Sequence, residues 1–448
     1  MNVIFIAIDT LRADRLTCYG YSKSTSPNLE RISKEGVLFE KFYASDIPTQ
    51  PAYTTIYTSL YGVNHGIVSH GSAEQNLSEN ISTLPQILRE KGVHTAAVDN
   101  LLGMKHWFGL GYNEYFDTSK KMQLVTAEEV NSIVLPWLKR NKKTPFFLFI
   151  HYWDPHTPYT PPQKYRRLFY EGDEKDPSNR SMEKFKDYIY YPLFQRVIGE
   201  PLGEITDVEY ISAQYDAEIR YVDERVGEVI GLLEELKLSE ETLLIITSDH
   251  GESLTEHGIY FDHHGVYETT IRVPLILWWK GNLPSGKKIK DFFEHVDLLP
   301  TILDAFGIRR EEKMEGVSLL SVIEGKKKIQ REFICCGECT YQAKRCINTG
   351  KWKLIKSIGG DLYHRPKYEL YWLEKDPEEK ENLAEKYPEI VDRLEIQLTR
   401  WVEEKLGESP DPIRCQLSRG LPGHRWLREA LRSQNLSWEE WFSRQRYW

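Results

Sequence analysis

The stretch LLIITSDHGE, residues 243–252, decides the fold class of this chain of 448 residues. Its first half is apolar without polar alternation, which is typical of a strand buried on both faces of a parallel sheet. Its second half begins at once with Asp249 and His250. Ligands bind at the carboxyl ends of such strands, so we expect these two side chains at a binding rim.

Four further apolar runs repeat this pattern, with helix-like segments between them: VIFIAID (3–9), HTAAVDN (94–100), FFLFIHYWD (146–154) and VPLILWW (273–279). Strands that alternate with helices predict an α/β fold, with a large and mostly parallel sheet between helices. Asp9 and Asp154 end two of these runs, as Asp249 ends the run quoted first. We therefore expect three carboxylates at one rim of the sheet.

Segments in which this alternation of strands and helices stops define the predicted domain boundaries. Residues 1–310 form a catalytic α/β domain, in which the Tyr-rich segment 165–207 is an insertion expected over the site. Residues 311–408 form a smaller subdomain with a small antiparallel sheet and a helix. Residues 409–448 form a tail rich in Trp and Arg, which we expect to pack on the body or on another subunit. A homo-oligomer formed through this tail is therefore one of the expected states.

Charge and composition restrict the partners. The net charge of −9 argues against nucleic acids and anionic membranes as partners. A small anionic substrate remains compatible, because bound metal ions would reverse the local field. The first residues lack a basic flank, and their apolar run is too short for a signal peptide or a membrane span, so a cytoplasmic location is expected. The CCGEC segment, 335–339, lacks a second ligand pair for a zinc knuckle, so reduced cysteines are expected.

The segment TSDHGESLTEHGIYFDHHGVYE, residues 247–268, concentrates imidazoles. A carboxylate beside an imidazole at a strand end, as in Asp249-His250, is a good ligand pair for Zn²⁺ or Mn²⁺. His257, His263 and His264 follow within one loop. Surface histidines are the alternative reading, but a cluster that follows a strand end favours a site.

A second polar strand end is HYWDPHTPY, residues 151–159. His151, Asp154 and His156 are candidates for a second metal site or for binding the substrate. A structural turn shaped by the two prolines is the alternative.

Thr49 lies in SDIPTQPAY, residues 45–53, just before a predicted helix. A hydroxyl at a helix N-terminus gains from nearby N–H groups and from the positive end of the helix dipole. If a divalent cation bound it, this hydroxyl could lose its proton at neutral pH and attack an ester. A plain N-cap is the alternative.

Taken together, these stretches resemble the sulfatase family of the alkaline-phosphatase superfamily. The resemblance runs in order through most of the chain, in IDTLRADRLTCYGY, PAYTTIYTSLYGVNHG, FFLFIHYWDPHTPYTPP, TLLIITSDHGE, YETTIRVPLI and LYWLEKDPEEKENLAEKYPEI. It implies a large α/β domain followed by a smaller C-terminal subdomain. It also implies metal-assisted, in-line attack on a sulfate or phosphate ester, with Asp9, Asp249 and His250 as metal ligands and Thr49 as the nucleophile.

The departures from this family decide the expected chemistry. Sulfatases carry a Cys or Ser that is oxidised to formylglycine, followed by x-Pro-Ser-Arg, whereas this chain has Thr49 followed by Gln-Pro-Ala-Tyr. Oxidised threonine would be a ketone and not an aldehyde. Thr10 follows Asp9 where paired acids are common, and His250 favours Zn or Mn over Ca or Mg. The Lys expected before Tyr267 is also missing, and His263 or His264 occupies that region.

Each departure favours the Thr-nucleophile branch without formylglycine, whose members hold one or two divalent ions and cleave phosphate mono- or diesters. The expected roles are: catalysis by Thr49, His263 and His264; substrate binding by Arg12, Tyr53, His151 and His156; a metal site of Asp9, Thr49, Asp249 and His250; and a further metal site of Asp154, His156 and His264. The alternatives are a sulfuric-ester hydrolase that uses the unmodified threonine, a phospho-group transferase, and a non-catalytic binding protein on the same fold.

Overall fold

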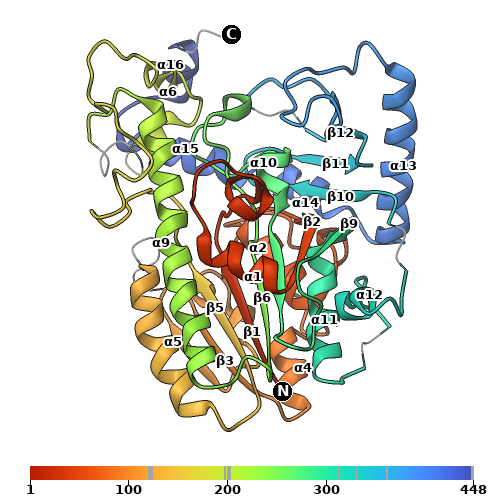
Figure 1. Ribbon diagram of the computed structural model, residues 1–448. Helices are drawn as coiled ribbons and strands as arrows, with labels where there is room; N and C mark the ends of the chain where they lie inside the picture. The colour runs from red at the N-terminus through yellow and green to blue at the C-terminus, as the bar shows by residue number, and fades with distance from the viewer. Residues whose placement is uncertain are drawn as a thin grey trace.

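A large sheet of nine strands forms the centre of the computed structural model, which describes residues 1–119, 125–195, 198, 203–309, 312–328, 331–359 and 362–444 (Figure 1). The strand order is β4-β3-β5-β1-β6-β8-β2-β7, and β9 pairs with β2. The bounds are Asn2–Ile8 (β1), Val37–Tyr43 (β2), His94–Asp99 (β3), Glu114–Asp117 (β4), Phe146–Tyr152 (β5), Thr242–Thr247 (β6), Arg272–Val273 (β7), Leu275–Trp278 (β8) and Lys287–Glu294 (β9).

Strand β1 shows why these runs are apolar throughout. Successive side chains of a strand point to opposite faces, so a strand covered on both sides needs apolar residues at every position. Ile4, Ile6 and Ile8 pack in the core on one face, together with residues of α1 (Pro27–Glu35), α5 (Ala127–Asn141) and α9 (Val208–Glu235). Val3, Phe5 and Ala7 pack on the other face, with residues of α2 (Thr49–Thr58), α4 (Leu84–Glu90), α11 (Leu298–Ala305) and α12 (Leu319–Ile323).

The register of the central strands brings distant carboxylates level with one another. Strands β1 and β6 are parallel, and Ala7 pairs with Thr247. Asp9 and Asp249 each lie two residues beyond this pair, so both leave the sheet at the same edge. On the other side of β1, Ala7 pairs with His151 of the parallel strand β5. The site is therefore expected where β1, β5 and β6 end.

A second sheet of four antiparallel strands lies beyond this edge, in the blue part of Figure 1. Its strands are Ile334–Glu338 (β10), Lys344–Asn348 (β11), Trp352–Ser357 (β12) and Tyr368–Trp372 (β13), and α13 (Pro388–Leu406) packs on it. A buried ion pair joins the two parts of the chain: the Lys353 ammonium contacts Glu268 at 3.1 Å and Glu379 at 2.8 Å. The loop that carries the predicted histidines ends at Glu268, so this pair anchors its far end.

The tail consists of α14 (Pro412–Arg419), α15 (Pro422–Ser433) and α16 (Trp438–Arg444), and it packs on its own chain. The indole N–H of Trp441 donates to the Ile189 carbonyl, and the Gln434 amide donates to the Pro192 carbonyl. Trp426 packs edge-on against Tyr341, with ring centroids 5.7 Å apart. The first two contacts join the tail to the inserted segment 165–207, and the third joins it to the C-terminal subdomain.

The predicted fold class is confirmed, and so are the four apolar runs that became β1, β3, β5 and β6. The run 273–279 forms two short strands, β7 and β8, which are antiparallel to their neighbours. The predicted domain boundary at 310–311, parts of the segment 165–207 and the last four residues of the tail lie outside the described residues. Among the described residues, no helix has the length and apolar character needed to cross a bilayer.

Candidate active site

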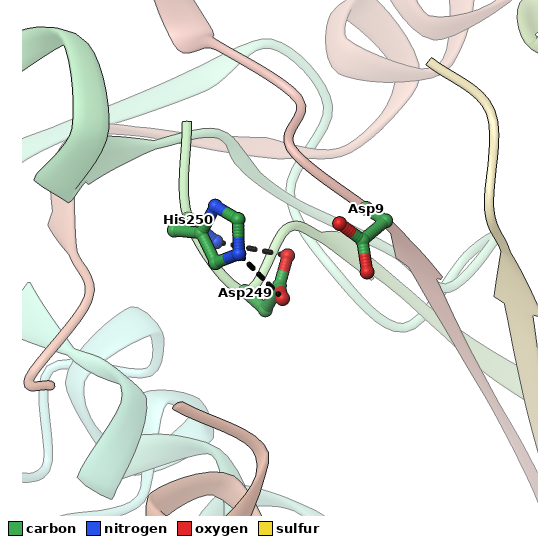
Figure 2. A group of neighbouring side chains, drawn as sticks. All are labelled: Asp9, Asp249 and His250. Carbon is green, nitrogen blue, oxygen red and sulfur yellow. Dashed lines mark hydrogen bonds and ion pairs between the residues drawn. The ribbon is translucent and has the colours of Figure 1, made fainter. Parts of the chain in front are cut away.

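Asp9 and Asp249 meet at the edge of the sheet where β1 and β6 end (Figure 2). Thr10 has a left-handed backbone, with a φ of 54°, so the chain turns sharply after Asp9. In this turn the Thr10 amide donates to the Asp249 carboxylate over 3.3 Å, and the His250 amide donates to the same oxygen over 2.9 Å. The two strand ends therefore hold each other in place.

Asp9, Asp249 and His250, called here the strand-end group, fit a divalent cation. Their candidate ligand atoms all lie within 4.8 Å of one another, and all three residues are buried. One oxygen of Asp9 and one of Asp249 have no hydrogen-bond partner. Buried carboxylates need a counter-charge, and two carboxylates with an imidazole form a ligand set suited to Zn²⁺ or Mn²⁺. This donor set and its unpaired oxygens are the observations that favour a metal.

The two carboxylates have opposite pKa shifts. Burial alone would raise the pKa of Asp9, but the hydrogen bond from His151 and the nearby imidazoles outweigh it and hold that pKa at about 2. Burial raises the pKa of Asp249 well above its ordinary value, and the negative charge of Asp9 raises it further. The first carboxylate thus opposes ionisation of the second, as is typical of carboxylates that share a site.

His250 is held in a single tautomer. Its Nδ1 donates to the Gly251 carbonyl over 2.9 Å, which leaves Nε2 with a free lone pair. Burial lowers the pKa of His250 well below its ordinary value, so the imidazole is neutral. Its Nε2 lies 3.2 Å from Asp249 Oδ2 and 3.2 Å from Thr49 Oγ1. The nitrogen that suits a metal therefore faces both the carboxylates and the threonine.

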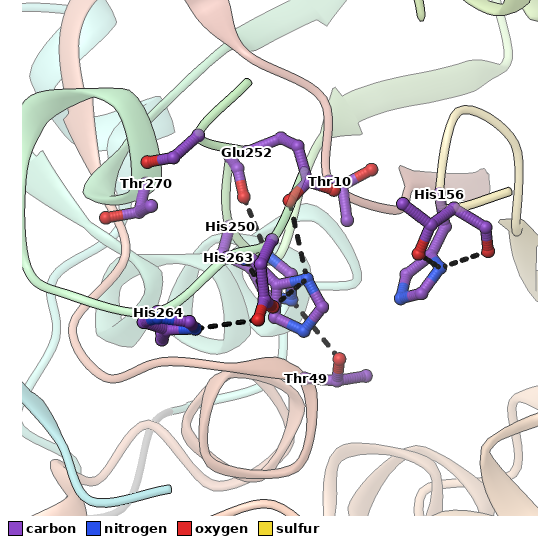
Figure 3. Close-up of polar contacts among 12 residues, drawn as sticks. Thr10, Thr49, His156, His250, Glu252, His263, His264 and Thr270 are labelled. Carbon is purple, nitrogen blue, oxygen red and sulfur yellow. Dashed lines mark hydrogen bonds and ion pairs between the residues drawn. The ribbon is translucent and has the colours of Figure 1, made fainter. Parts of the chain in front are cut away.

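Thr49 is the first residue of α2, and its side chain points toward the strand-end group (Figure 3). Pro48 occupies the N-cap position, and the Thr49 hydroxyl bonds His250 instead of capping the helix. The plain N-cap reading of Thr49 is therefore wrong. Two other threonines of α2, Thr54 and Thr58, donate to carbonyls of their own helix, as is usual for this residue inside helices.

His151 lies between the carboxylates of Asp9 and Asp99. Its Nδ1 contacts Asp99 over 2.8 Å and its Nε2 contacts Asp9 over 3.2 Å. The carboxylate of Asp99 also accepts from the Asn100 amide and from the Tyr115 hydroxyl. Because an outer partner of this kind orients a metal ligand, the structure gives His151 a supporting position, and not the substrate contact predicted from the sequence.

A second group of candidate ligands lies next to the first: Glu252, Asp262 and His263, called here the loop cluster. The rings of His250 and His263 have centroids 4.5 Å apart. Our sequence reading of this segment considered its histidines and overlooked Glu252 and Asp262. The signal was present in SDHGE and FDHH, where each acid lies within two residues of a histidine.

The predicted further site of Asp154, His156 and His264 is not assembled. Among the residues that the structure describes, these three do not form a group of close ligand atoms. Asp154 turns to the start of α5, where its carboxylate accepts from the Ala127 amide over 2.8 Å. The free N–H groups at a helix N-terminus attract a carboxylate, which explains this orientation. His156 does remain at the site, with its ring centroid 5.3 Å from that of His263.

His264 faces away from Thr49, into a cluster of tyrosines. Its Nδ1 pairs with Asp262 over 2.8 Å, and its Nε2 contacts the hydroxyls of Tyr363 and Tyr188. Figure 3 shows His263 between His264 and His156. Of the two histidines that sequence reasoning left open, His263 is therefore the one that faces the site, and the catalytic role predicted for His264 is not supported by its position.

Arg12 and Tyr53 were predicted to bind the substrate, and both are turned inward. The Arg12 guanidinium donates to Asp14, to Glu256 and to the Glu252 carbonyl, so its donors are occupied. Burial alone would lower the pKa of Arg12. The negative charges of Asp14 and Glu256 outweigh this effect and raise the pKa well above its ordinary value. The Tyr53 ring is fully buried and packs 5.0 Å from the ring of His151. Arg12 thus fixes the loop that follows His250, and Tyr53 supports the outer side of the site.

Family profiles match this architecture over most of the chain. The sulfatase profile matches residues 1–308, and a profile described as "N-sulphoglucosamine sulphohydrolase, C-terminal" matches residues 255–404. Among curated relatives, an N-acetylglucosamine-6-O-sulfatase of Bacteroides thetaiotaomicron is 24% identical, over 88% of this chain and 85% of the relative. A choline-sulfatase of Rhizobium meliloti is 28% identical, over 88% of this chain and 84% of the relative.

Solved structures share the fold at lower identity. A phosphonate monoester hydrolase of Agrobacterium radiobacter is 20% identical and superposes with a TM-score of 0.73, over 90% of this chain and 96% of that chain. A protein solved with its substrate D-glucosamine-2-N,6-O-disulfate is 21% identical, with a TM-score of 0.74, over 92% of this chain and 99% of that chain. The fold, the strand-end group and the profile over residues 1–308 agree: the chain belongs to the sulfatase family of the alkaline-phosphatase superfamily, and it is a hydrolase that acts on ester bonds.

Proposed function

We propose that this sulfatase-family protein is a metal-dependent hydrolase of phosphate mono- or diesters, with Thr49 as its nucleophile. One observation carries the proposal: the Thr49 hydroxyl lies 3.2 Å from His250 Nε2, beside the unpaired carboxylate oxygens of Asp9 and Asp249. A hydroxyl becomes a nucleophile when a neighbouring base or metal ion promotes the loss of its proton. The strand-end group lies beside Thr49 and could hold such a metal ion.

The metal has a defined role in this proposal. A divalent cation held by Asp9, Asp249 and His250, with Zn or Mn favoured over Ca or Mg, supplies positive charge that lowers the pKa of a neighbouring hydroxyl and offsets negative charge on the ester. His151 holds the Asp9 carboxylate through a hydrogen bond of 3.2 Å. The Gly251 carbonyl keeps His250 Nε2 free of a proton. These two contacts orient the ligands before substrate binds.

The reaction then proceeds in two displacements. Thr49 Oγ1, after giving its proton to water, forms a bond to phosphorus while the bond from phosphorus to the leaving oxygen breaks. The leaving alcohol departs with the bonding electron pair and takes a proton from water. A water molecule next attacks phosphorus, the Thr49 oxygen departs with the electron pair of the breaking bond, and the proton released by the attacking water returns to the Thr49 oxygen. Burial of the site excludes bulk water, which strengthens each electrostatic contact in it.

The identity of residue 49 favours phosphoric over sulfuric esters. A threonine cannot form the aldehyde that sulfatases with formylglycine use, so attack falls to its secondary alkoxide. Tyr53 also occupies the position where the resemblance implies an arginine, and its ring is buried against His151. The positive charge that an arginine would supply is therefore missing at position 53.

A sulfuric ester is the second candidate substrate, because several relatives are named as sulfatases of sugars and choline. A substrate panel separates the two candidates. It contains 4-nitrophenyl phosphate, bis(4-nitrophenyl) phosphate, a 4-nitrophenyl phosphonate and 4-nitrophenyl sulfate, each assayed with Zn²⁺ and with Mn²⁺. We expect the phosphate mono- or diester to give the highest kcat/KM. Sulfate turnover above that of every phosphorus ester would overturn the choice, and turnover that depends on an added alcohol would identify a phospho-group transferase.

Thr49→Ala tests the nucleophile. We expect kcat on the best ester to fall by about 1,000-fold or more, since removal of a covalent nucleophile leaves only binding and electrostatic contributions. Thr58→Ala is the matched control, because Thr58 lies in the same helix and its hydroxyl bonds only backbone groups, the Thr54 carbonyl and the Leu60 amide. Acid quench during turnover should also give a phosphorylated peptide that contains Thr49. Full activity of Thr49→Ala would refute the assignment.

A further inference from the structure

The loop cluster of Glu252, Asp262 and His263 has ligand chemistry that the proposed reaction does not use. Candidate ligand atoms of the three residues lie within 4.8 Å of one another. Glu252 and Asp262 are buried, and the His263 side chain is 15% exposed. The side chains of Glu252 and His263 are drawn beside His250 in Figure 3. The cluster is therefore both enclosed and close to the strand-end group.

Glu252 is the member that most needs a counter-charge. Neither oxygen of its fully buried carboxylate accepts a hydrogen bond from a described residue. The nearest basic atom is His263 Nδ1 at 3.7 Å, which is beyond hydrogen-bond length. The hydroxyl of Tyr159 faces Glu252 but is also without a hydrogen-bond partner. A buried charge is stable in a protein when it is paired or when it coordinates a metal.

The backbone holds the cluster in one arrangement. Ser253 and Asp262 form an isolated antiparallel bridge, with amide-to-carbonyl distances of 2.8 and 3.1 Å in the two directions. This bridge fixes Glu252 and His263, which are the chain neighbours of its two ends. Asp262 Oδ1 accepts from the His263 amide, and Oδ2 contacts His264 Nδ1 over 2.8 Å. An outer histidine that orients a ligating carboxylate is usual around metal ions.

We propose that Glu252, Asp262 and His263 bind a second divalent cation, of the Zn²⁺ or Mn²⁺ type, next to the strand-end group. Two carboxylates and an imidazole are a ligand set for such ions. The cation neutralises Glu252, which His263 approaches only to 3.7 Å, while Asp262 is also paired with His264. The site formed by these three residues takes the place of the predicted further site, which the positions of Asp154 and His264 do not allow. The inference does not depend on Thr49 as nucleophile, because metal binding requires no turnover.

The competing explanation is that a protonated His263 is itself the counter-charge of Glu252. Counting metal ions separates the two explanations. Purified protein is stripped with a chelator, saturated with Zn²⁺ or with Mn²⁺, desalted, and its metal content per chain is measured by inductively coupled plasma mass spectrometry. Isothermal titration of the stripped protein gives the stoichiometry independently.

We expect two ions per chain in the wild type and one in Glu252→Gln. His263→Lys is the second variant, because its ammonium places a fixed positive charge in the cluster and should displace the ion without leaving the acids unpaired. Glu256→Gln is the matched control: Glu256 belongs to the same loop, but it pairs with Arg12, so two ions should remain. Circular dichroism checks that each variant is folded. If Glu252→Gln does not fold, the metal content of His263→Lys decides the test. One ion in the wild type, or two in folded His263→Lys, would overturn the proposal.

Discussion

The strand-end group and the loop cluster contain the same kinds of side chain but are held in different ways. Asp9 and Asp249 follow two strands that are remote in the sequence, and the parallel register of β1 and β6 places them level. Glu252, Asp262 and His263 lie in one loop, and a single two-residue bridge holds them. A ligand set on a sheet edge is as rigid as the sheet, whereas a set on a loop depends on local anchors such as Arg12 and the Lys353 pair.

This difference suggests a division of labour. The strand-end group faces Thr49, and His250 contacts it directly. In the loop cluster, the His263 ring packs near the rings of His250 and His156. Among the described contacts, none joins the loop cluster directly to Thr49. We therefore expect changes in the strand-end group to abolish turnover, and changes in the loop cluster to alter the metal content first.

The largest effect is expected for Asp249→Asn. This change removes a charged ligand from the strand-end group, so kcat/KM on the best ester should fall by at least about 1,000-fold. The metal-free variant should nevertheless unfold at a higher temperature than the metal-free wild type, because the repulsion between Asp9 and Asp249 is gone. Steady-state kinetics and thermal unfolding in chelator measure the two effects.

Asp291→Asn is the control for Asp249→Asn, since Asp291 is an exposed acid on β9 of the same sheet. It should change neither quantity. Activity of Asp249→Asn within about tenfold of the wild type would mean that the strand-end group is not the centre of the reaction.

A smaller effect is expected for His151→Gln. His151 contacts Asp9 from behind, so its loss should weaken metal binding at the strand-end group by about 10- to 100-fold. The loop cluster should keep its ion, which sharpens the comparison between the two groups. At saturating metal, KM should stay close to that of the wild type. A large rise in KM with unchanged metal affinity would restore His151 as a substrate-binding residue.

The smallest effect on activity is expected for Asp46→Asn, which concerns a strand-end acid outside both groups. Asp46 follows β2, and its carboxylate accepts from the Gly62 amide and the Thr55 hydroxyl. Burial raises the pKa of Asp46 from 3.8 to about 7. The folded protein therefore binds the Asp46 proton more tightly than the unfolded chain does. The stability from this proton is fully present below pH 3.8 and is lost as pH rises through 7.

Urea unfolding of wild type and Asp46→Asn at a series of pH values tests this. The free energy of unfolding of the wild type, minus that of the variant, should fall between about pH 4 and pH 7 by on the order of a few kcal/mol and then level off. A difference that stays constant with pH would mean that folding does not shift the pKa of Asp46, and a difference that rises with pH would mean that folding lowers this pKa.

Much of the central sheet was predictable, because a strand covered on both faces must be apolar at each position. Strands β2 and β9 were missed, since VLFEKFY and KKIKDFFE mix charged and apolar residues. Their burial explains this: the middle of β2 is half-buried, and β9 is exposed at several positions along its length. The resemblance to a family led to Thr49, Asp9, Asp249 and His250, which the structure brings together.

The sequence by itself determined the fold class, the family and the three residues, Asp9, Asp249 and His250, that the structure brings together around Thr49. The fold class follows from the apolar runs, and the resemblance of several ordered stretches to one family leads to the site residues. Only the tertiary structure decided where neighbouring side chains point. It directed Asp154 to the start of α5, Arg12 to Asp14 and Glu256, and His264 to the tyrosines, while Glu252 joined His263. The physical reason is that a polar side chain takes its orientation from the partners that burial brings near it, and those partners lie elsewhere in the chain.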